Sequence, residues 1–264
     1  MKRSIKMLTD IANEQEKYIV IIPAAGIGQR FSRLRANDLV CFPKQYAMLG
    51  EKTVLEHVLA CFEACTWIDE IVIALHANDT YFDKLRMNRT KNITVVTGGD
   101  TRAQSVFNAL HSIQHKVKAN DWILVHDAAR PCLSLRDLQN LKSKLSLHGV
   151  GGLLAERITA TVKQSQQNNQ IYRTLNRDKL WQALTPQMFR NEVLYSSLQY
   201  CLDKKFAVTD ESQAVECLGF VPQLIEAYDF NIKITTQNDL HLAQAFLMSQ
   251  CRNTHRVQQE MTEV

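Results

Sequence analysis

The chain has 264 residues, is 45% apolar and 22% charged, and carries a formal net charge of +4. These values are close to the average for globular domains, so they exclude a disulfide-stapled mini-protein, a collagen-like chain and an intrinsically disordered one. The basic residues are scattered singly rather than gathered in a dense stripe, so we expect no nucleic-acid partner. The longest nearly apolar stretch, from Tyr18 to Gly28, contains Pro23 and two glycines and is too short to span a bilayer, so we expect no membrane association.

The cysteines and the N-terminal residues indicate where in the cell the protein is expected. The seven cysteines form no CxxC pair and no closely spaced Cys/His pattern, which favours reduced thiols and a cytoplasmic location. Residues 1–17 carry charges throughout and contain no apolar segment typical of a secretory signal. We therefore predict a loosely ordered extension at 1–17, a single domain at 18–250 and a C-terminal tail at 251–264.

Predicted strands and helices alternate along most of the chain. Continuous apolar runs predict buried strands at Tyr18–Ile22, Glu70–Leu75, Ile93–Thr97 and Trp122–His126. An alternating pattern predicts a late strand region at Glu226–Thr235. Helical spacing of apolar residues predicts helices at Thr53–Cys65, Arg102–Ile113, Arg136–Leu147 and Gln237–Leu247. This alternation predicts an α/β fold with a Rossmann-like, mostly parallel sheet and helices on both faces.

One segment interrupts the alternation. Two β-like runs, Ile158–Lys163 and Gln170–Leu175, are separated by a polar stretch at 164–169. This pattern predicts a β-hairpin, and we expect an arm at about 156–178 that projects from the sheet. Such a hairpin cannot bury both of its faces against its own sheet and is marginal alone in water, so a second subunit is expected to cover it.

Three polar or glycine-rich loops directly follow predicted strands. They are Pro23–Arg30, Gly98–Arg102 and Asp127–Pro131. The carboxyl ends of parallel strands meet at one rim of a sheet, where ligands bind in folds of this class. The three loops together therefore predict a ligand site at that rim.

The first loop has a composition that suits phosphate. Gly26 and Gly28 let backbone N–H groups approach phosphate oxygens, although an isolated GxG is equally consistent with a tight turn. The loop is not a P-loop, because only one residue separates its glycines. It is not a dinucleotide-binding GxGxxG either, because Phe31 stands where the last glycine is required.

Two cations accompany this loop. Arg30 lies two residues after Gly28, and Lys44 follows Pro43, which restricts the backbone before it. A guanidinium and an ammonium beside a glycine loop suit negative charge that builds up on phosphoryl oxygens. The pattern GxGxR…PK therefore indicates phosphoryl-group chemistry more strongly than either cation alone.

The pattern resembles the nucleotidyltransferases that join a polyol phosphate to a nucleoside monophosphate. Further motifs occur in the same order, namely GGDTRAQS at 98–105, HDAARP at 126–131, LTPQ at 184–187, TDE at 209–211 and NIK at 231–233. Together, over about residues 18 to 247, they are similar to the family of 2-C-methyl-D-erythritol 4-phosphate cytidylyltransferases of the non-mevalonate isoprenoid pathway.

The resemblance implies a reaction and its partners. CMP would pass from CTP to 2-C-methyl-D-erythritol 4-phosphate by in-line attack of the substrate phosphate on the α-phosphorus, with release of pyrophosphate. The resemblance also implies a homodimer with interlocked arms and a cytoplasmic enzyme. Mg²⁺ or another divalent cation would be held mainly by triphosphate oxygens, so no protein residue is predicted as a dedicated metal ligand.

The resemblance also assigns roles to individual residues. Arg30 and Lys44 are implied as the catalytic cations. The implied nucleotide-binding residues are Ala24, Ala25, Gly26, Gly28, Gly99, Asp100, Ser105 and Asp127. The implied substrate-positioning residues are Thr161, Arg177, Thr185, Thr209 and Lys233. The chain departs from the family pattern at Ala160, where an acid is usual, and in the length of segment 32–41, which separates Arg30 from Lys44.

Other readings of the same residues remain open at this point. Asp100 could cap the following helix, Thr185 could shape a turn before Pro186, and His126 could simply be packed or hydrogen-bonded. We predict that Trp181 and Phe189 are core residues. The whole chain could instead be a related cytidylyltransferase acting on ribitol 5-phosphate, or a catalytically silent nucleotide-binding protein.

Overall fold

A computed structural model describes residues 16–26, 42–87 and 90–262, with side chains described up to residue 250. Residues 1–15 of the predicted extension, together with Gly28 and Arg30, lie outside the described residues. Glu16 and Lys17 are tied to the body. The Glu16 carboxylate accepts from Trp122 Nε1 (3.0 Å) and Arg190 Nη1 (2.6 Å), and the Lys17 backbone N–H donates to Asp121 Oδ1 (2.9 Å).

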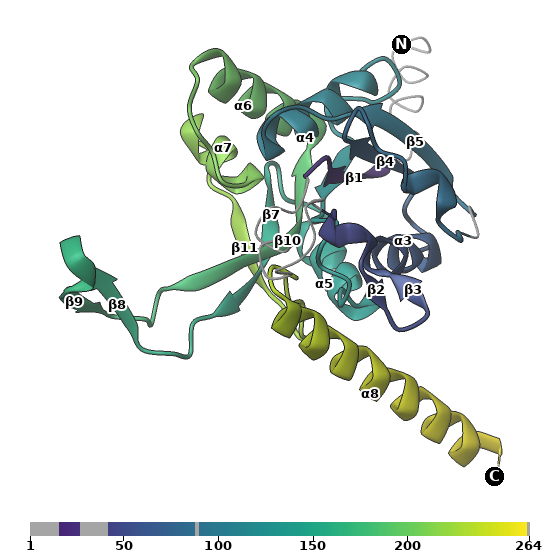
Figure 1. The fold of residues 1–264 in the computed structure, drawn as a ribbon. Helices are drawn as coiled ribbons and strands as arrows, with labels where there is room; N and C mark the ends of the chain where they lie inside the picture. The colour runs from purple at the N-terminus through teal and green to yellow at the C-terminus, as the bar shows by residue number, and fades with distance from the viewer. Residues whose placement is uncertain (1–15, 27–41, 88–89, 263–264) are drawn as a thin grey trace, which may run out of the picture.

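Within the described residues, seven strands form one central sheet, which Figure 1 shows running through the body. In spatial order they are β11 (Gln223–Glu226), β7 (Gly151–Arg157), β10 (Trp181–Arg190), β6 (Trp122–Val125), β1 (Tyr18–Ala24), β4 (Glu70–Leu75) and β5 (Asn92–Thr97). Only β10 runs antiparallel to its two neighbours in this sheet, and the other pairs are parallel. The prediction of a mostly parallel sheet is confirmed.

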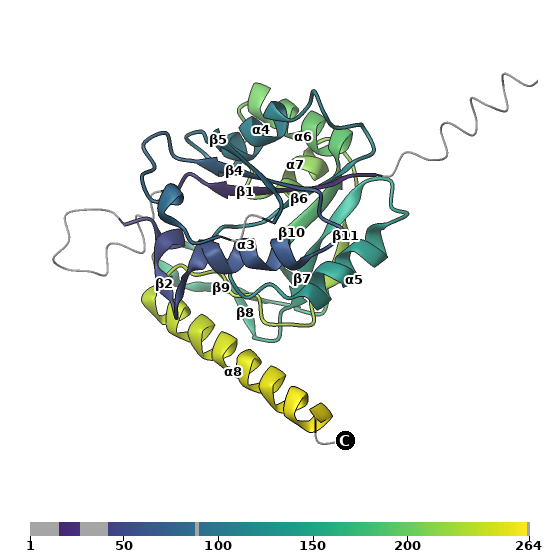
Figure 2. The ribbon, with the colours of Figure 1, turned by 90° about the vertical axis from the view of Figure 1, so that its right-hand side faces the viewer.

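Helices cover both faces of the sheet, as predicted. α3 (Val54–Ala64) and α5 (Leu135–Leu145) lie on one face, and α4 (Arg102–Ser112), α6 (Asn191–Asp203) and α7 (Glu211–Cys217) lie on the other (Figure 2). The alternation of β1 explains this arrangement, because Val20 and Ile22 pack in the core with α3 and α5 while Ile19 and Ile21 pack with the opposite group. All four side chains are buried, as expected of a central parallel strand.

Four of the helices, α3, α4, α5 and α7, begin at side-chain caps. Thr53 and Glu56 form a reciprocal capping box at α3, and Ser134 and Asp210 cap α5 and α7. Thr101 caps α4 by accepting from the backbone N–H of Gln104 (3.1 Å). The alternative that Asp100 caps this helix is therefore wrong.

The remaining elements lie around this core. η1 (Lys44–Tyr46) is followed by the hairpin of β2 (Met48–Leu49) and β3 (Lys52–Thr53), and η2 (Phe82–Lys84) lies between β4 and β5. α8 (Gln237–Thr262) extends beyond the predicted end at Leu247 and into the segment predicted as a tail (Figure 1).

The predicted late strand at Glu226–Thr235 is wrong except at its first residue, which ends β11. Residues 231–235 form no regular element, because their backbone groups bond to other parts of the chain. Arg130 Nη1 donates to Asn231 O (2.7 Å), and the Ile234 N–H donates to Ala129 O (2.8 Å). The segment is therefore fixed against the loop after β6 rather than added to the sheet.

The predicted hairpin is present and projects from the body, as Figure 1 shows. Its strands are β8 (Val162–Ser165) and β9 (Ile171–Leu175), which form a separate two-stranded sheet around η3 (Gln167–Asn169). The first strand thus starts later than predicted. Ile171 and Tyr172 are 63% and 62% exposed, so the arm presents large apolar side chains to solvent. Its role in dimerisation remains a prediction.

The two aromatic residues expected in the core differ in how deeply they are buried. Phe189 is fully buried. Trp181 is only half-buried, and the guanidinium of Arg157 stacks on its ring at 4.2 Å from the centroid. Trp181 lies where β10 leaves the arm, so the core prediction for it is wrong.

Candidate functional site

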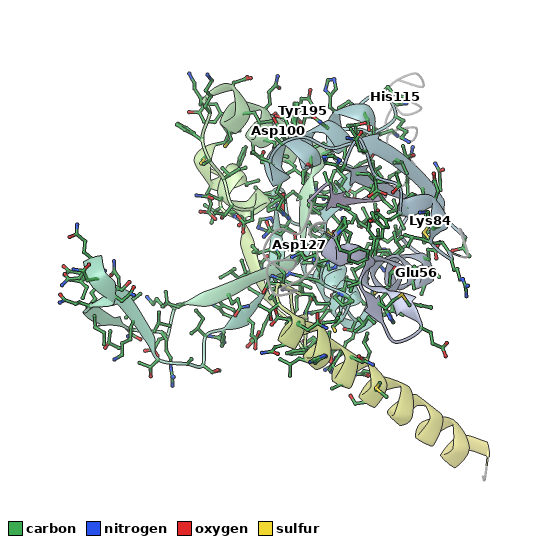
Figure 3. All side chains as sticks on the ribbon, viewed as in Figure 1. Glu56, Lys84, Asp100, His115, Asp127 and Tyr195 are labelled. Atoms are coloured by element: carbon green, nitrogen blue, oxygen red, sulfur yellow. The ribbon has the colours of Figure 1, made fainter. Side chains whose placement is uncertain are left out.

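A cavity of about 240 Å³ opens at the rim where β1 and β6 end. The three loops predicted from the sequence meet there, which confirms their convergence. They supply Pro23, Ala24, Ala25 and Gly26 from the first, Gly99, Asp100, Thr101 and Arg102 from the second, and Asp127, Ala128 and Ala129 from the third. Lys44, Gln45, Ser105 and Lys233 complete the lining. Asp127 lies in the body of the molecule, away from the projecting arm (Figure 3).

Close packing explains the pair of glycines at 98–99, against Ala25 of the first loop for Gly98 and against Gln104 of α4 for Gly99. A Cβ atom on Gly98 would lie 2.5 Å from the Cβ of Ala25, and one on Gly99 would overlap Gln104. The Ser105 hydroxyl accepts from the Gly99 N–H (3.0 Å) and donates to Thr101 O (2.9 Å). Ser105 therefore lines the cavity and also fixes the shape of the second loop.

Two neighbouring residues of η1 form hydrogen bonds at the cavity wall. Gln45, which is buried, donates from Nε2 to Ala24 O (2.8 Å) and to Gly26 O (3.4 Å). Lys44 Nζ donates to Ile234 O (2.7 Å), which brings its ammonium to the cavity wall. We predicted no role for Gln45, although its position directly after Lys44 could have indicated that it lies at the site.

Asp127 lies at the centre of a cluster of charged side chains. Its carboxylate accepts from Arg102 Nε (3.0 Å) and Lys233 Nζ (2.8 Å), and Arg130 Nε lies 3.5 Å away. Burial alone would raise the pKa of Asp127, but Arg102 and Lys233 outweigh it and hold that pKa well below its usual range. Asp127 is therefore ionised at neutral pH.

Arg102 also reaches a second carboxylate. Its Nη1 and Nη2 atoms donate to the two oxygens of Glu211, at 2.5 and 3.0 Å. Glu211 is almost completely buried, and burial raises its pKa in spite of the neighbouring guanidinium. Neither residue had a predicted role, because the motif residues at 102 and 211 carry no local sign that they meet.

A chain of hydrogen bonds supports the loop after β6. His126 Nε2 lies 3.0 Å from Arg130 O, a carbonyl that can only accept, so Nε2 carries the proton and Nδ1 accepts from the Thr185 hydroxyl (3.0 Å). The same hydroxyl accepts from the Asp127 N–H (3.2 Å). Burial lowers the pKa of His126 to about 4. The reading of His126 as packed and hydrogen-bonded is confirmed.

The other predicted positioning residues do not line this cavity. Thr185 is buried behind Asp127, and the Thr209 hydroxyl donates to Gln213 Oε1 (3.0 Å) at the start of α7. Thr161 and Arg177 are exposed on the arm, where Arg177 donates to Thr159 O. Of the predicted positioning residues, Lys233 is the one that reaches the cavity in a single copy of the described chain.

The cavity suits a cation carried in by an anionic ligand. Among the described residues, no group of three or more His, Cys, Asp or Glu side chains could hold a metal ion. Asp127 and Asp100 are the carboxylates that line the cavity, so the donor set fits a divalent ion with most of its ligands from phosphate oxygens and water. Among the described helices, none combines the length and the apolar character that a membrane span requires.

Comparisons with known proteins agree with the motifs. Residues 18–249 match the model of the family described as IspD, 2-C-methyl-D-erythritol 4-phosphate cytidylyltransferase. The enzyme of that name from Haemophilus ducreyi is 44% identical over 88% of this chain and 96% of its own, and that from Aliivibrio fischeri is 40% identical over 89% and 95%. A Francisella tularensis crystal structure of that title superposes with a TM-score of 0.73 at 39% identity, covering 86% of this chain and 98% of its own.

The buried histidine predicts a pH dependence of stability. His126 has a folded pKa of about 4, below the unfolded value of 6.5, so the unfolded chain binds an extra proton between these values. The free energy of unfolding should therefore fall by about 2 kcal/mol through this group between pH 7 and pH 5. Urea unfolding at both pH values should show a smaller fall in His126→Asn than in the wild type. His115→Asn, at an exposed position, is the control and should behave as wild type. An equal fall in His126→Asn and wild type would contradict the assignment.

Proposed function

The chain belongs to the 2-C-methyl-D-erythritol 4-phosphate cytidylyltransferase family, and we propose that the cavity at the rim of its sheet is where the two substrates react. It transfers CMP from CTP to 2-C-methyl-D-erythritol 4-phosphate and releases pyrophosphate. The family match decides against ribitol 5-phosphate as the acceptor and against a silent nucleotide-binding protein. The observation that carries the proposal is a glycine-lined cavity in which Arg102 and Lys233 pair with Asp127 and Lys44 adds a third cation to the wall.

This reaction needs positioning and charge neutralisation rather than a side-chain nucleophile. The substrate phosphate has a second pKa of about 6 and is already largely dianionic at neutral pH. Its oxygen attacks the α-phosphorus of CTP in line and expels pyrophosphate. Cations held in place before the reaction stabilise the charge that develops on the phosphoryl oxygens. We assign this role to Lys44, and to Arg30 on the evidence of the GxGxR…PK pattern.

The nucleotide would occupy the side of the cavity formed by the first two loops. Ala24, Ala25 and Gly99 leave room for a pyrimidine, and the close contact of the two loops limits the space for a larger base. Gly26 and Gly28 would offer backbone N–H groups to the phosphates. Asp100 and Ser105 lie on the lining of the same side.

Mg²⁺ is the proposed cofactor. Asp127 is the cavity carboxylate that would contact it, directly or through water, with phosphate oxygens as the main ligands. When bound, the ion neutralises charge on the triphosphate and on the departing pyrophosphate. Because Arg102 and Lys233 already pair with Asp127, these two cations would have to share its carboxylate with the ion.

The acceptor side of the site would be completed by a second copy of the chain. Thr161 and Arg177 lie on an arm that projects away from their own cavity and exposes Ile171 and Tyr172. In a two-fold dimer an arm can reach the partner's site, and the exposed apolar residues would be buried. Thr185 and Thr209 would act from within the same subunit, Thr185 through its contacts to Asp127 and His126. The compartment we propose is the cytoplasm, where the free thiols of the described cysteines remain reduced.

The catalytic cations give the first test of this proposal. Lys44→Ala or Arg30→Ala should lower kcat by about a hundredfold or more, the scale of losing one preorganised donor at developing charge. CTP affinity, measured by isothermal titration calorimetry, should change much less. The control is Lys84→Ala, a lysine outside the cavity that should retain full turnover. Turnover of either cation variant within about threefold of wild type would show that the assigned role is wrong.

Base selection gives a second test. The cytosine amino group donates where uracil can only accept, so acceptors placed for CTP would be left unpaired with UTP. An unpaired buried acceptor costs about 1–3 kcal/mol, so kcat/KM for CTP should exceed that for UTP by about tenfold or more. Equal kcat/KM values for the two nucleotides would rule out this account of the pocket.

The shared site is tested by mixing two inactive variants. When Lys44→Ala and Arg177→Ala are mixed equally and allowed to exchange subunits, half of the dimers contain one of each. In a mixed dimer one site inherits both defects and the other inherits neither. Activity should therefore recover to about a quarter of wild type.

Native mass spectrometry of the same mixture is the control, because it shows whether mixed dimers have formed. If Arg177 serves its own subunit, every site in the mixture carries one defect and activity does not recover. Mixed dimers without recovered activity would overturn the shared-site arrangement. A protein that stays monomeric at assay concentration would overturn the dimer itself.

A further inference from the structure

Two motifs, LTPQ at 184–187 and TDE at 209–211, contain residues that the proposed chemistry does not use. Gln187, Asp210 and Glu211 do not line the cavity, yet Gln187 and Glu211 are each only 1% exposed. A buried carboxylate such as Glu211 is costly unless its charge is compensated, so its place in the structure calls for a physical reason.

The compensation comes from one residue that does line the cavity. Both oxygens of Glu211 accept from Arg102, through Nη1 and Nη2, and the third nitrogen, Nε, donates to Asp127 at 3.0 Å. The guanidinium thus bridges two carboxylates. A bidentate pair fixes the plane of the guanidinium, and that plane determines where the Nε–H bond points. The orientation of the bond to Asp127 therefore depends on Glu211.

Glu211 is itself held in place by the start of α7. Gln187, on β10, donates from Nε2 to Asp210 Oδ2 (3.0 Å) and accepts at Oε1 from the Ser212 N–H (2.8 Å). Asp210 caps the helix through the Gln213 N–H (2.9 Å). These bonds fix the residues on both sides of Glu211 to a central strand of the sheet. The two motifs thus form one connected support.

We propose that Glu211 is a positioning residue of the transfer reaction. It orients Arg102, and Arg102 in turn holds the Asp127 carboxylate at the place the reaction requires. This inference rests on the proposed function, which sets Asp127 beside the metal-bound phosphates. It predicts that the effect of Glu211 on catalysis passes through Asp127, which a role in holding α7 alone would not require.

A double-mutant cycle separates the two roles. Glu211→Gln keeps the side-chain shape but places an NH₂ group against one of the Arg102 donors, so one of the two bonds is lost. We expect kcat/KM to fall by about tenfold to a hundredfold, the scale of a small misplacement in an active site. In an Asp127→Asn background the same change should cost less than about threefold, because the residue it positions is already impaired.

The matched control is Glu70→Gln. Glu70 is also a buried carboxylate, paired with Lys116 at 2.6 Å and with the Thr94 hydroxyl at 2.7 Å, but it begins β4 and so lies at the end of the parallel strands opposite the cavity rim. This variant should keep wild-type kcat/KM. Thermal unfolding of all variants reports any loss of stability separately from turnover.

The outcomes distinguish this inference from the proposed function beneath it. If Asp127→Asn alone is fully active, the proposed place of Asp127 is wrong. If Asp127→Asn is impaired and Glu211→Gln is not, or if the two losses multiply, the positioning role is wrong while the proposed function stands. Should Glu211→Gln fail to fold, Arg102→Lys carries the test, because a lysine keeps the charge but cannot bridge both carboxylates. Its loss should likewise vanish in the Asp127→Asn background, and losses that multiply would overturn the proposal.

Discussion

The buried carboxylate of Asp127 is the group on which the organisation of the site depends. It is 7% exposed, and moving a carboxylate out of water costs several kcal/mol unless partners replace the lost hydration. Two of its three cationic partners come from distant parts of the chain. Arg102 begins α4, Arg130 follows in the same loop, and Lys233 belongs to the irregular segment at 231–235. Compensating this one charge therefore brings together the pieces that form the cavity wall.

The same cluster leaves the cavity short of negative charge. Three cationic side chains, Lys44, Arg102 and Lys233, line the cavity against two carboxylates, Asp100 and Asp127. An anionic ligand such as a triphosphate would complete the balance. A site built for phosphoryl transfer has this property, because its donors must be in place before the charge develops.

The sequence was informative where one local pattern determines the structure. β4 has the predicted bounds and β1 begins at the predicted residue, because continuous apolar runs mark buried parallel strands. The three rim loops were predicted for the same reason, since each directly follows such a strand. The strand prediction is wrong at 231–235 because alternating side chains there resemble a strand. The backbone of this segment instead forms hydrogen bonds with Arg130 and Ala129 rather than with a neighbouring strand. Tertiary hydrogen bonds of this kind produce no periodic pattern in the amino-acid sequence.

The contact between Arg102 and Glu211 could not be predicted from the sequence, for a related reason. The two residues are 109 positions apart, and each one is equally compatible with an exposed helix start. Only the packing of α4 and α7 on the same face of the sheet makes them neighbours (Figure 2). Motif order indicated that both segments matter, and the structure supplies the contact that relates them.

The reversed strand β10 connects the arm to the site. It begins at Trp181, beside the arm, and by Gln187 it pairs with β6 in the middle of the sheet. Between Ala183 and Gln187 its register with β7 shifts, and such an irregularity re-aims side chains and frees backbone groups from the ladder. Thr185 lies within this shift. Its hydroxyl bonds to His126 and the Asp127 N–H, and its carbonyl accepts from Asn231 Nδ2 (2.7 Å). A single strand thus carries both the base of the arm and, through Thr185, the support of Asp127.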